Sequence, residues 1–323
     1  MAEKKMVDVF SDVERETAMS ANPAGYAVTE LGAQDERIVT LAADMSNTVA
    51  EFIGKFPERY IEVGIAETNS VSLAAGLAAA GLVPYVYSMS PFGILKTAEQ
   101  WRTDVDYNHL PVRLVGRLSG VAMGYFGTSH YAVEDIAIAR TMNNTVVLSP
   151  ADAASCISLM RSTAHLEAPV YIRIAEAAPQ VYDEPPEYEH GTWPKLRNGG
   201  DVTLVGHGMG TGLAAQAAEI LFEQDSVEAT VLDAAYLRPF DEAAIVAAAE
   251  NTGRILTVEE HSVVGGLGTI VAETVARAGL PVKLDQVALP DTDLEVGVPA
   301  ELYEHYGLTP ANVAKRALAL ARR

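Results

Sequence analysis

Short apolar runs alternate with longer Ala-rich segments along most of the chain. Runs of four or five residues rich in β-branched side chains predict buried strands, and the segments between them have the length of helices. Before residue 178 the predicted strands cover residues 38–41, 84–87, 112–115, 145–148 and 170–174. After residue 200 they cover 202–205, 229–232, 255–258 and 282–284, followed by a helix from about Thr309. This alternation predicts an α/β fold, with mostly parallel sheets carrying helices on both faces.

The alternation fails between Ala178 and Gly200, where the prolines Pro179, Pro185, Pro186 and Pro194 accumulate. Such a stretch is typical of a linker. The chain has 323 residues, which is the usual length of two domains. We therefore predict two consecutive domains: residues 1–185, a linker at 186–200, and residues 201–323.

The composition narrows the class of partner. Hydrophobic residues make up 49% of the chain and charged residues 20%, which is typical of a globular protein rather than a disordered one. Lys+Arg 23 against Asp+Glu 43 gives a net charge of −20. That charge repels a phosphate backbone and an anionic membrane surface. We expect no nucleic-acid partner and no membrane partner.

Three further features favour a cytoplasmic protein. The N-terminal segment is charged and lacks the apolar core of a signal peptide. The apolar stretch 71–89 is broken by Gly76, Gly81 and Pro84, so it predicts a helix followed by a strand, not a membrane span. The single cysteine, Cys156, lies in an apolar run, cannot form an internal disulfide, and is expected in the core.

The second predicted domain opens with a strand that enters a helix through the glycines of residues 206–212. A phosphate could bind at such a helix N-terminus. The spacing is not G-x-G-x-x-G, and tight turns in parallel sheets use glycine anyway, so we favour the turn. The chain also lacks G-x-x-x-x-G-K-[ST], H-E-x-x-H and G-x-S-x-G.

Glu67 stands out as candidate chemistry. It ends the sequence Val63-Gly-Ile-Ala-Glu67 and falls in the first turn of an apolar helix over 71–80. A carboxylate there is favoured by the helix dipole alone. Other candidates follow in order along the chain: Asp44, Met45 and Ser46 after the first strand, Phe92, Gly127-Thr-Ser-His130, and Glu259-Glu-His261 before Gly265-Gly-Leu-Gly268.

In this order, these residues resemble the C-terminal half of the transketolase and deoxyxylulose-phosphate synthase family, its pyrimidine-binding domain followed by its C-terminal domain. The V-G-I-A-E stretch is the most specific match. The family's diphosphate-binding domain, with its G-D-G motif, is missing from the chain. The resemblance therefore implies the small subunit of a split transketolase that uses thiamine diphosphate. It also implies a separate diphosphate-binding subunit that holds Mg²⁺ (or Ca²⁺), in an α2β2 assembly.

The resemblance also implies a role for each matching residue. Glu67 would face N1′ of the cofactor's aminopyrimidine, where a buried carboxyl, whose pKa is raised, can share a proton with a ring nitrogen. Phe92 would stack on that ring. Met45 would form the wedge beneath the cofactor, flanked by Asp44 and Ser46, and Ile65 belongs to the same cofactor-binding set. His130 would face the substrate, and His261 would line the entrance or bridge the domains.

The chain departs from the family at the substrate positions. Leu118 and Phe126 stand where sugar-phosphate transketolases have a histidine and an aspartate. Glu176 replaces a phosphate-binding arginine, and residues 21–23 lack another. A carboxylate repels a phosphate, so we expect at least one substrate that is not the usual sugar phosphate.

The function predicted from the sequence is transfer of a two-carbon ketol unit from a ketose-like donor to an aldehyde acceptor. Two alternatives stay open at this point. One is a decarboxylating transfer from a 2-oxo acid such as pyruvate, as in deoxyxylulose-phosphate synthase or the β subunits of 2-oxo acid dehydrogenases. The other is a non-catalytic scaffold that kept the fold, although a scaffold has no need of both Glu67 and Phe92.

Overall fold

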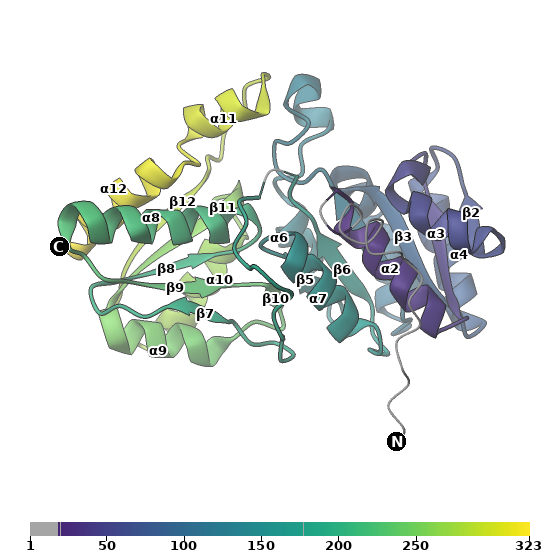
Figure 1. The fold of residues 1–323 in the computed structure, drawn as a ribbon, viewed down its shortest axis with the longest axis horizontal. Helices are drawn as coiled ribbons and strands as arrows, with labels where there is room; N and C mark the ends of the chain where they lie inside the picture. Colours follow the sequence, from purple (N-terminus) through teal and green to yellow (C-terminus); the bar gives the residue numbers. More distant parts are fainter. Residues whose placement is uncertain (1–18, 20, 177) are drawn as a thin grey trace.

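A computed structural model describes residues 19, 21–176 and 178–323 of the chain (Figure 1). Its first sheet has seven strands in the order β10-β5-β6-β4-β3-β1-β2, all pairing in parallel except β10. The strands are β1 (Ile38–Ala42), β2 (Tyr60–Glu62), β3 (Val83–Met89), β4 (Arg113–Arg117), β5 (Val146–Leu148), β6 (Val170–Arg173) and β10 (Tyr236–Arg238). Strands β1, β4 and β6 are almost wholly buried, as expected of a sheet covered on both faces.

Helices connect these strands and pack around the sheet. Helix α2 packs against α7, and Figure 1 shows both in front of the sheet. The Asp152 side chain caps the start of α7 in a capping box with Ser155, which fixes where that helix begins. The helices are α2 (Pro23–Gln34), α3 (Ala50–Lys55), α4 (Glu67–Ala79), α5 (Ala98–Gln100), α6 (Asp135–Arg140) and α7 (Ala153–Thr163). Short 3₁₀ and π turns add η1 (Ser46–Val49), η2 (Pro57–Arg59), η3 (Pro91–Leu95), η4 (Trp101–Asp106) and η5 (Gly124–Ser129).

The second sheet has five strands in the order β12-β11-β8-β9-β7, and only β7 pairs in the antiparallel sense. The strands are β7 (Lys195–Arg197), β8 (Val202–Gly206), β9 (Ala229–Asp233), β11 (Arg254–Ser262) and β12 (Lys283–Leu289). Figure 1 shows α8 and α12 on one side of this sheet and α9 on the other. The helices are α8 (Met209–Asp225), α9 (Glu242–Thr252), α10 (Leu267–Arg277), α11 (Pro299–Tyr306) and α12 (Pro310–Ala321).

The predicted fold class is confirmed: two consecutive, mostly parallel sheets are surrounded by helices. Three short strands were not predicted. Strand β7 lies inside the segment interpreted as a linker, and β10 leaves the second half of the chain to pair with β5 of the first sheet. The two halves are therefore tied by backbone hydrogen bonds. The residue boundaries of the domains stay a prediction.

Two sequence features find a packing explanation. A Cβ on Gly210 would lie 2.1 Å from the Val258 carbonyl oxygen, so glycine is needed where α8 crosses β11. Cys156 is buried as expected, and burial raises the pKa of its thiol to about 12.

Within the described ranges, no helix combines the length and the apolarity that a membrane crossing requires.

Candidate functional site

The predicted site residues follow the carboxyl ends of adjacent parallel strands. The order β6-β4-β3-β1-β2 brings five strand ends to one edge of the first sheet. Beyond those ends lie Glu176 after β6, Leu118 after β4, Phe92 after β3, Met45 after β1 and Glu67 after β2. Ligands of open α/β sheets bind at this kind of edge. The topology therefore collects residues that are more than 130 positions apart in the sequence.

Glu67 is the first residue of α4 and is buried, with 5% of its surface exposed. The Lys96 ammonium group donates a hydrogen bond to Oε2 of Glu67 over 2.6 Å. The same Nζ atom lies 6.0 Å from the centre of the Phe92 ring. Lys96 therefore stands beside both the candidate carboxylate and the candidate stacking ring. Its own side chain is 48% exposed, so the ion pair opens to solvent on one side.

The turn after β1 contributes Asp44, Met45 and Ser46. Met45 is buried, whereas Asp44 and Ser46 are exposed, and Asp44 adopts φ 55°. The Glu62 carboxylate at the end of β2 accepts hydrogen bonds from the backbone N–H groups of Asp44 and Gly64. Burial opposes ionisation of Glu62, but the hydrogen bonds from Tyr60 and from these backbone groups together lower its pKa. The Glu62 carboxylate thus holds two turns: the one after β1 and the one between β2 and α4.

Ile65 lies between β2 and α4, two residues before the first residue of that helix. It is 76% exposed, so its aliphatic side chain presents apolar surface to solvent near the start of α4. Buried Met45, half-buried Phe92 and exposed Ile65 supply apolar surface at the same sheet edge as Glu67. A flat heterocycle with one polar ring nitrogen fits the chemistry of this set: a carboxyl partner among apolar walls.

His130 lies in a cluster of aromatic rings. Its imidazole stacks on Phe126 with centroids 4.5 Å apart, and it meets Phe92 edge-on at 5.1 Å. The Ser129 hydroxyl lies 2.9 Å from Nδ1 of His130. The structure therefore brings His130, Phe126 and Phe92 together. Leu118, at the start of the same loop, is half-buried and adopts φ 56°.

Glu176 forms a bidentate ion pair with Arg117 at the end of β4, with N–O distances of 3.1 Å for both hydrogen bonds. The pair lines a small cavity of about 150 Å³ together with Ala21 and Pro23. The two segments predicted to lack phosphate-binding arginines therefore meet at one place. The guanidinium found there, that of Arg117, is already bound to a carboxylate.

His261 lies at the end of β11 in the second sheet and is fully buried. Its Nδ1–H donates to the Ser262 carbonyl oxygen at 2.9 Å, and Nε2 has no partner within the described part of the chain. Burial lowers the pKa of its imidazole. Nδ1 lies 4.0 Å from the Glu259 carboxylate, which caps the N-terminus of α10 through Leu267 and Gly268.

Comparison with known protein families decides the identity of this arrangement. Residues 18–180 match the pyrimidine-binding domain of transketolase, and residues 191–313 match the transketolase C-terminal domain. The chain belongs to the transketolase family. The two matched domains together cover most of the chain.

Three relatives illustrate how close the match is. An apulose-4-phosphate transketolase subunit from Phocaeicola vulgatus is 36% identical over 298 residues, covering 91% of this chain and 95% of the relative. A 6-deoxy-6-sulfo-D-fructose transketolase subunit from Clostridium sp. (strain MSTE9) is 36% identical, covering 89% and 90%. A solved split-gene transketolase, described as an inactive β4 tetramer, is 37% identical with a TM-score of 0.83, covering 93% of this chain and 98% of that chain.

Two site residues of this transketolase chain were not predicted from the sequence. Lys96 follows Phe92 by four positions, the spacing that puts two residues on one face of a helical turn, and this spacing is the signal that could have found it. Arg117 offers no local signal, because its partner Glu176 is 59 positions away. Only the pairing of β4 with β6 brings the two together.

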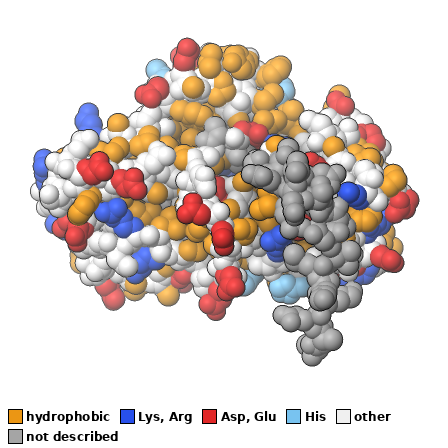
Figure 2. Space-filling view, viewed as in Figure 1, with side chains coloured by type: hydrophobic (Ala, Val, Ile, Leu, Met, Phe, Trp, Pro, Cys, Tyr) orange, Lys and Arg blue, Asp and Glu red, His pale blue; other side chains and the backbone are white. Residues whose placement is uncertain are grey.

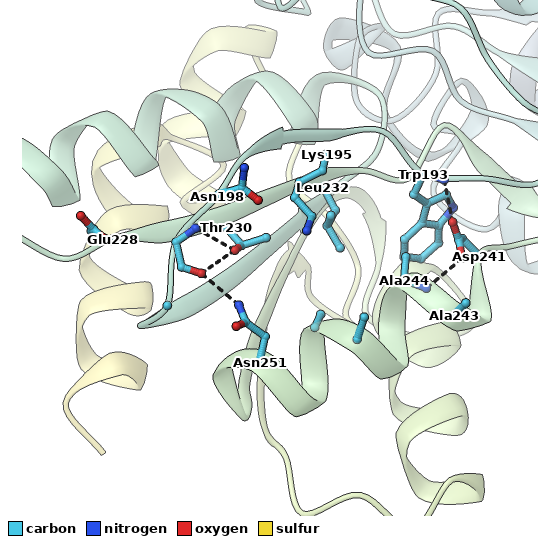
Figure 3. A pocket seen from close by; sticks show the side chains of 14 residues that line it. Trp193, Lys195, Asn198, Glu228, Thr230, Leu232, Asp241, Ala243, Ala244 and Asn251 are labelled. Atoms are coloured by element: carbon cyan, nitrogen blue, oxygen red, sulfur yellow. Dashed lines mark hydrogen bonds between the residues drawn. The ribbon is translucent and has the colours of Figure 1, made fainter.

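A separate cavity lies in the C-terminal domain between β7, β9 and α9 (Figure 3). It measures about 810 Å³, and its lining includes Trp193, Asp241 and Asn251. Asp241 accepts hydrogen bonds from the backbone of Trp193 and Ala244, and Asn251 donates to the Gly199 carbonyl oxygen. These polar groups serve the protein's own backbone. We assign the cavity no part in the site at the first sheet.

Proposed function

We propose that this chain provides one half of a thiamine diphosphate site and acts, with a partner subunit, in the transfer of a two-carbon ketol unit from a ketose-like donor to an aldehyde acceptor. The observation that carries the proposal is Glu67. It is a buried carboxylate at a helix N-terminus, placed at the sheet edge beside Phe92 and Met45. Burying a carboxylate costs free energy unless the group is paired, and Glu67 is paired with Lys96, whose own side chain is half-exposed.

The residues at the edge fit the aminopyrimidine end of thiamine diphosphate. When bound, the cofactor supplies the carbanion chemistry that protein side chains lack. Glu67 would hold a proton between one of its two carboxyl oxygens and the ring nitrogen N1′, next to or in place of the hydrogen bond that Oε2 accepts from Lys96. Phe92 would lie on the ring face, and Met45, flanked by Asp44 and Ser46, would press beneath the cofactor next to Ile65. These assignments are supported by the shared edge of the sheet.

Among the described residues, no group of three or more His, Cys, Asp or Glu side chains is arranged to hold a metal ion. We infer a separate diphosphate-binding subunit that holds Mg²⁺ or Ca²⁺ and completes the site in an α2β2 assembly. This inference is supported by the relatives that are named as transketolase subunits. We also infer a cytoplasmic enzyme, consistent with its charge and its single buried cysteine.

His130 would donate a hydrogen bond to the oxygens of the donor, and His261 would stabilise the junction of the domains from its buried position. Leu118 and Phe126 would give the substrate channel apolar walls. We infer that at least one substrate is not the usual sugar phosphate. This inference is supported by the names of the two relatives, which refer to apulose 4-phosphate and to a sulfofructose.

The Glu176–Arg117 pair supports this inference about substrates. Nε and Nη2 of Arg117 already donate to the Glu176 carboxylate, so this pair of donors is not available to a phosphate. Replacing Glu176 with Arg should create a phosphate site. We expect kcat/KM for xylulose 5-phosphate or ribose 5-phosphate to rise about tenfold or more, the effect of one added charge-assisted hydrogen bond. Efficient use of these sugars by the wild-type enzyme would show the inference to be wrong.

The function as a whole is tested by native mass spectrometry of the tagged chain, purified gently from its source cells. We expect a second chain of about 250–300 residues, the size of a separate diphosphate-binding α/β domain, together with thiamine diphosphate and a divalent cation. The purified complex should transfer a ketol unit from hydroxypyruvate to an aldehyde and release no CO₂ from pyruvate. A homomer that cannot be loaded with thiamine diphosphate would instead favour a scaffold.

A further inference from the structure

The loop of residues 118–134, which carries Phe126 and His130, is fastened to the C-terminal domain. Its backbone bonds to that domain at several points. The Gly297 N–H donates to the Gly124 carbonyl oxygen at 3.1 Å, and the Ser262 N–H donates to the Val133 carbonyl oxygen at 2.9 Å. The Tyr131 hydroxyl adds a bond of 2.6 Å to the Glu295 carbonyl oxygen. The loop thus belongs to the first domain by sequence, but it is hydrogen-bonded to the C-terminal domain.

The loop has an apolar back and an aromatic front. Val121, Tyr131 and Val133 are buried in the same hydrophobic cluster as Leu302 and Leu308 of the C-terminal domain. Phe126, by contrast, is 58% exposed and stacks on His130, which also meets Phe92. The position of His130 against the cofactor half-site therefore depends on how the back of the loop is held.

Glu260 of β11 lies at the base of the loop, where Gly120 pairs with Ala132; we call this pair and its immediate neighbours the neck. It is fully buried, and its Oε1 accepts a hydrogen bond from the Val121 N–H at 3.1 Å and another from the Tyr303 hydroxyl at 2.7 Å. The neck itself is closed by two hydrogen bonds of 3.0 Å between Gly120 and Ala132. A Cβ on Gly120 would lie 2.0 Å from Cδ of Glu260, so the carboxylate presses directly on the neck.

The backbone of Glu260 fastens the other strand of the neck. Its carbonyl oxygen accepts a hydrogen bond from Nη2 of Arg173 at 2.7 Å, and the same nitrogen donates to the Ala132 carbonyl oxygen at 3.1 Å. Arg173 is in turn fixed by Asp135 through a buried ion pair of 2.9 Å. Glu260 is thus tied to both sides of the neck, through Val121 on one side and through Arg173 and Ala132 on the other.

We propose that Glu260 is a positioning residue, through which the C-terminal domain sets the place of His130 and Phe126 at the substrate entrance. The consequence for substrate rests on the proposed function, whereas the anchoring of the loop does not. Glu260 itself is fully buried, and its side chain is bonded to Val121 and Tyr303. Its effect passes through Val121 and the neck of the loop, so its loss should alter substrate binding more than the chemical step.

Hydrogen exchange on the full-length chain tests the anchoring without a partner or a substrate. In Glu260→Ala, the amides of residues 119–132 should exchange at least about tenfold faster, as expected when a buried hydrogen bond is lost. Glu260→Gln keeps the size and an accepting oxygen, so it should restore protection to within about twofold. Glu301→Ala, at an exposed position of α11, is the matched control and should change nothing.

Two exchange results would overturn the anchoring. One is a loop that stays protected in Glu260→Ala. The other is faster exchange by the same factor throughout both sheets, which would mean that Glu260 only stabilises the whole chain. If Glu260→Ala does not fold, Tyr303→Phe decides instead. That variant removes one of the two donors to Oε1, and it should speed exchange in residues 119–132 by a few-fold.

Steady-state kinetics of the complex with its co-purified partner tests the effect on substrate. With hydroxypyruvate as donor, Glu260→Ala should raise KM about tenfold while kcat changes less than about threefold, and Glu260→Gln should recover both. A fall in kcat as large as the rise in KM, seen in both variants, would overturn the positioning role. A wild-type complex that does not turn over hydroxypyruvate would count against the proposed function, while the exchange result still decides the anchoring.

Discussion

Glu67 combines two properties that seldom occur together in a residue serving only the fold. It is buried, yet its partner Lys96 is half-exposed. We expect Glu67→Gln to lower kcat of the assembled enzyme by about 10²–10⁴-fold, the usual contribution of a group that positions or shares a proton. The melting temperature of the chain should change little, because the amide keeps the shape of the carboxylate. Ketol transfer from hydroxypyruvate measures the effect.

Glu250→Gln, at an exposed position on α9, is the control for this prediction and should retain full activity. Full activity of Glu67→Gln in the assembled complex would remove the argument for a catalytic half-site. It would return the chain to the scaffold hypothesis.

Lys96 competes with the cofactor for Glu67 if the ring nitrogen binds the same carboxylate oxygen as the lysine, Oε2. The lysine must give up a 2.6 Å hydrogen bond to Oε2 before a ring nitrogen can take its place. We therefore expect Lys96→Met to tighten the apparent binding of thiamine diphosphate about two- to tenfold, allowing for the exposure of the lysine. Titration of the complex with the cofactor, followed by Trp fluorescence, gives the dissociation constant.

Lys315→Met, at an exposed position of α12, should leave that constant unchanged. Weaker cofactor binding in Lys96→Met would mean that the lysine stays in the loaded site and supports the cofactor.

Single residues could be predicted only where their signal is local. Glu67 was predicted at the first turn of its helix because it comes just before the apolar segment 71–80, and the structure starts α4 at that residue. The grouping of Phe92, Phe126 and His130 follows from strand order, which no local pattern encodes. The family resemblance supplied these candidates, and the ring contacts between them came from the structure.

At the scale of elements, β11 carries three successive titratable side chains into a buried junction. Burial raises the pKa of Glu260 to about 7, against the opposing effects of Arg173 and the hydrogen bonds from Tyr303 and Val121. The folded state therefore favours protonated Glu260. Its contribution to stability is full below about pH 4.5 and is lost as the pH rises through about 7.

Glu260→Gln removes this pH dependence because the amide does not ionise. As the pH rises from 5 to 8, the free energy of unfolding of wild type should fall by about 1–3 kcal/mol more than that of the variant. Urea unfolding of the full chain at pH 5, 6, 7 and 8 measures the difference. The exposed Glu301→Gln should follow the wild-type curve. Parallel curves for wild type and Glu260→Gln would contradict the prediction.

The elements that the sequence did not predict are short strands. Strand β2 has three residues, and its side chains are only partly buried, so it lacks an apolar run. Strands β7 and β10 also have three residues each, and both pair in the antiparallel sense at the edge of a sheet. Such strands form because a neighbouring edge offers hydrogen-bond partners. That opportunity exists only in the assembled fold.

At the scale of the whole molecule, the two domains divide the work. The first sheet brings the candidate cofactor residues to its carboxyl edge, and the second domain holds the loop that faces them. Hydrophobic side chains gather over α11 and the adjoining loop in Figure 2. Four large hydrophobic residues are exposed in η5 and in the segment just before α11: Tyr125, Phe126, Val296 and Val298. Exposed apolar surfaces are typical of interaction sites, and this one adjoins the half-site because Phe126 stacks on His130, which meets Phe92.

We expect the partner subunit to cover this surface, with Val296 near its centre. Val296→Asp would bury an unpaired charge in the interface and should weaken association at least about tenfold. Phe222→Asp is the control, because Phe222 is a similarly exposed apolar residue on α8. Sedimentation of each variant with the co-purified partner measures association, and sedimentation of each variant alone measures self-association. Unchanged assembly in Val296→Asp would contradict the prediction, since a surface that tolerates a buried charge is not covered.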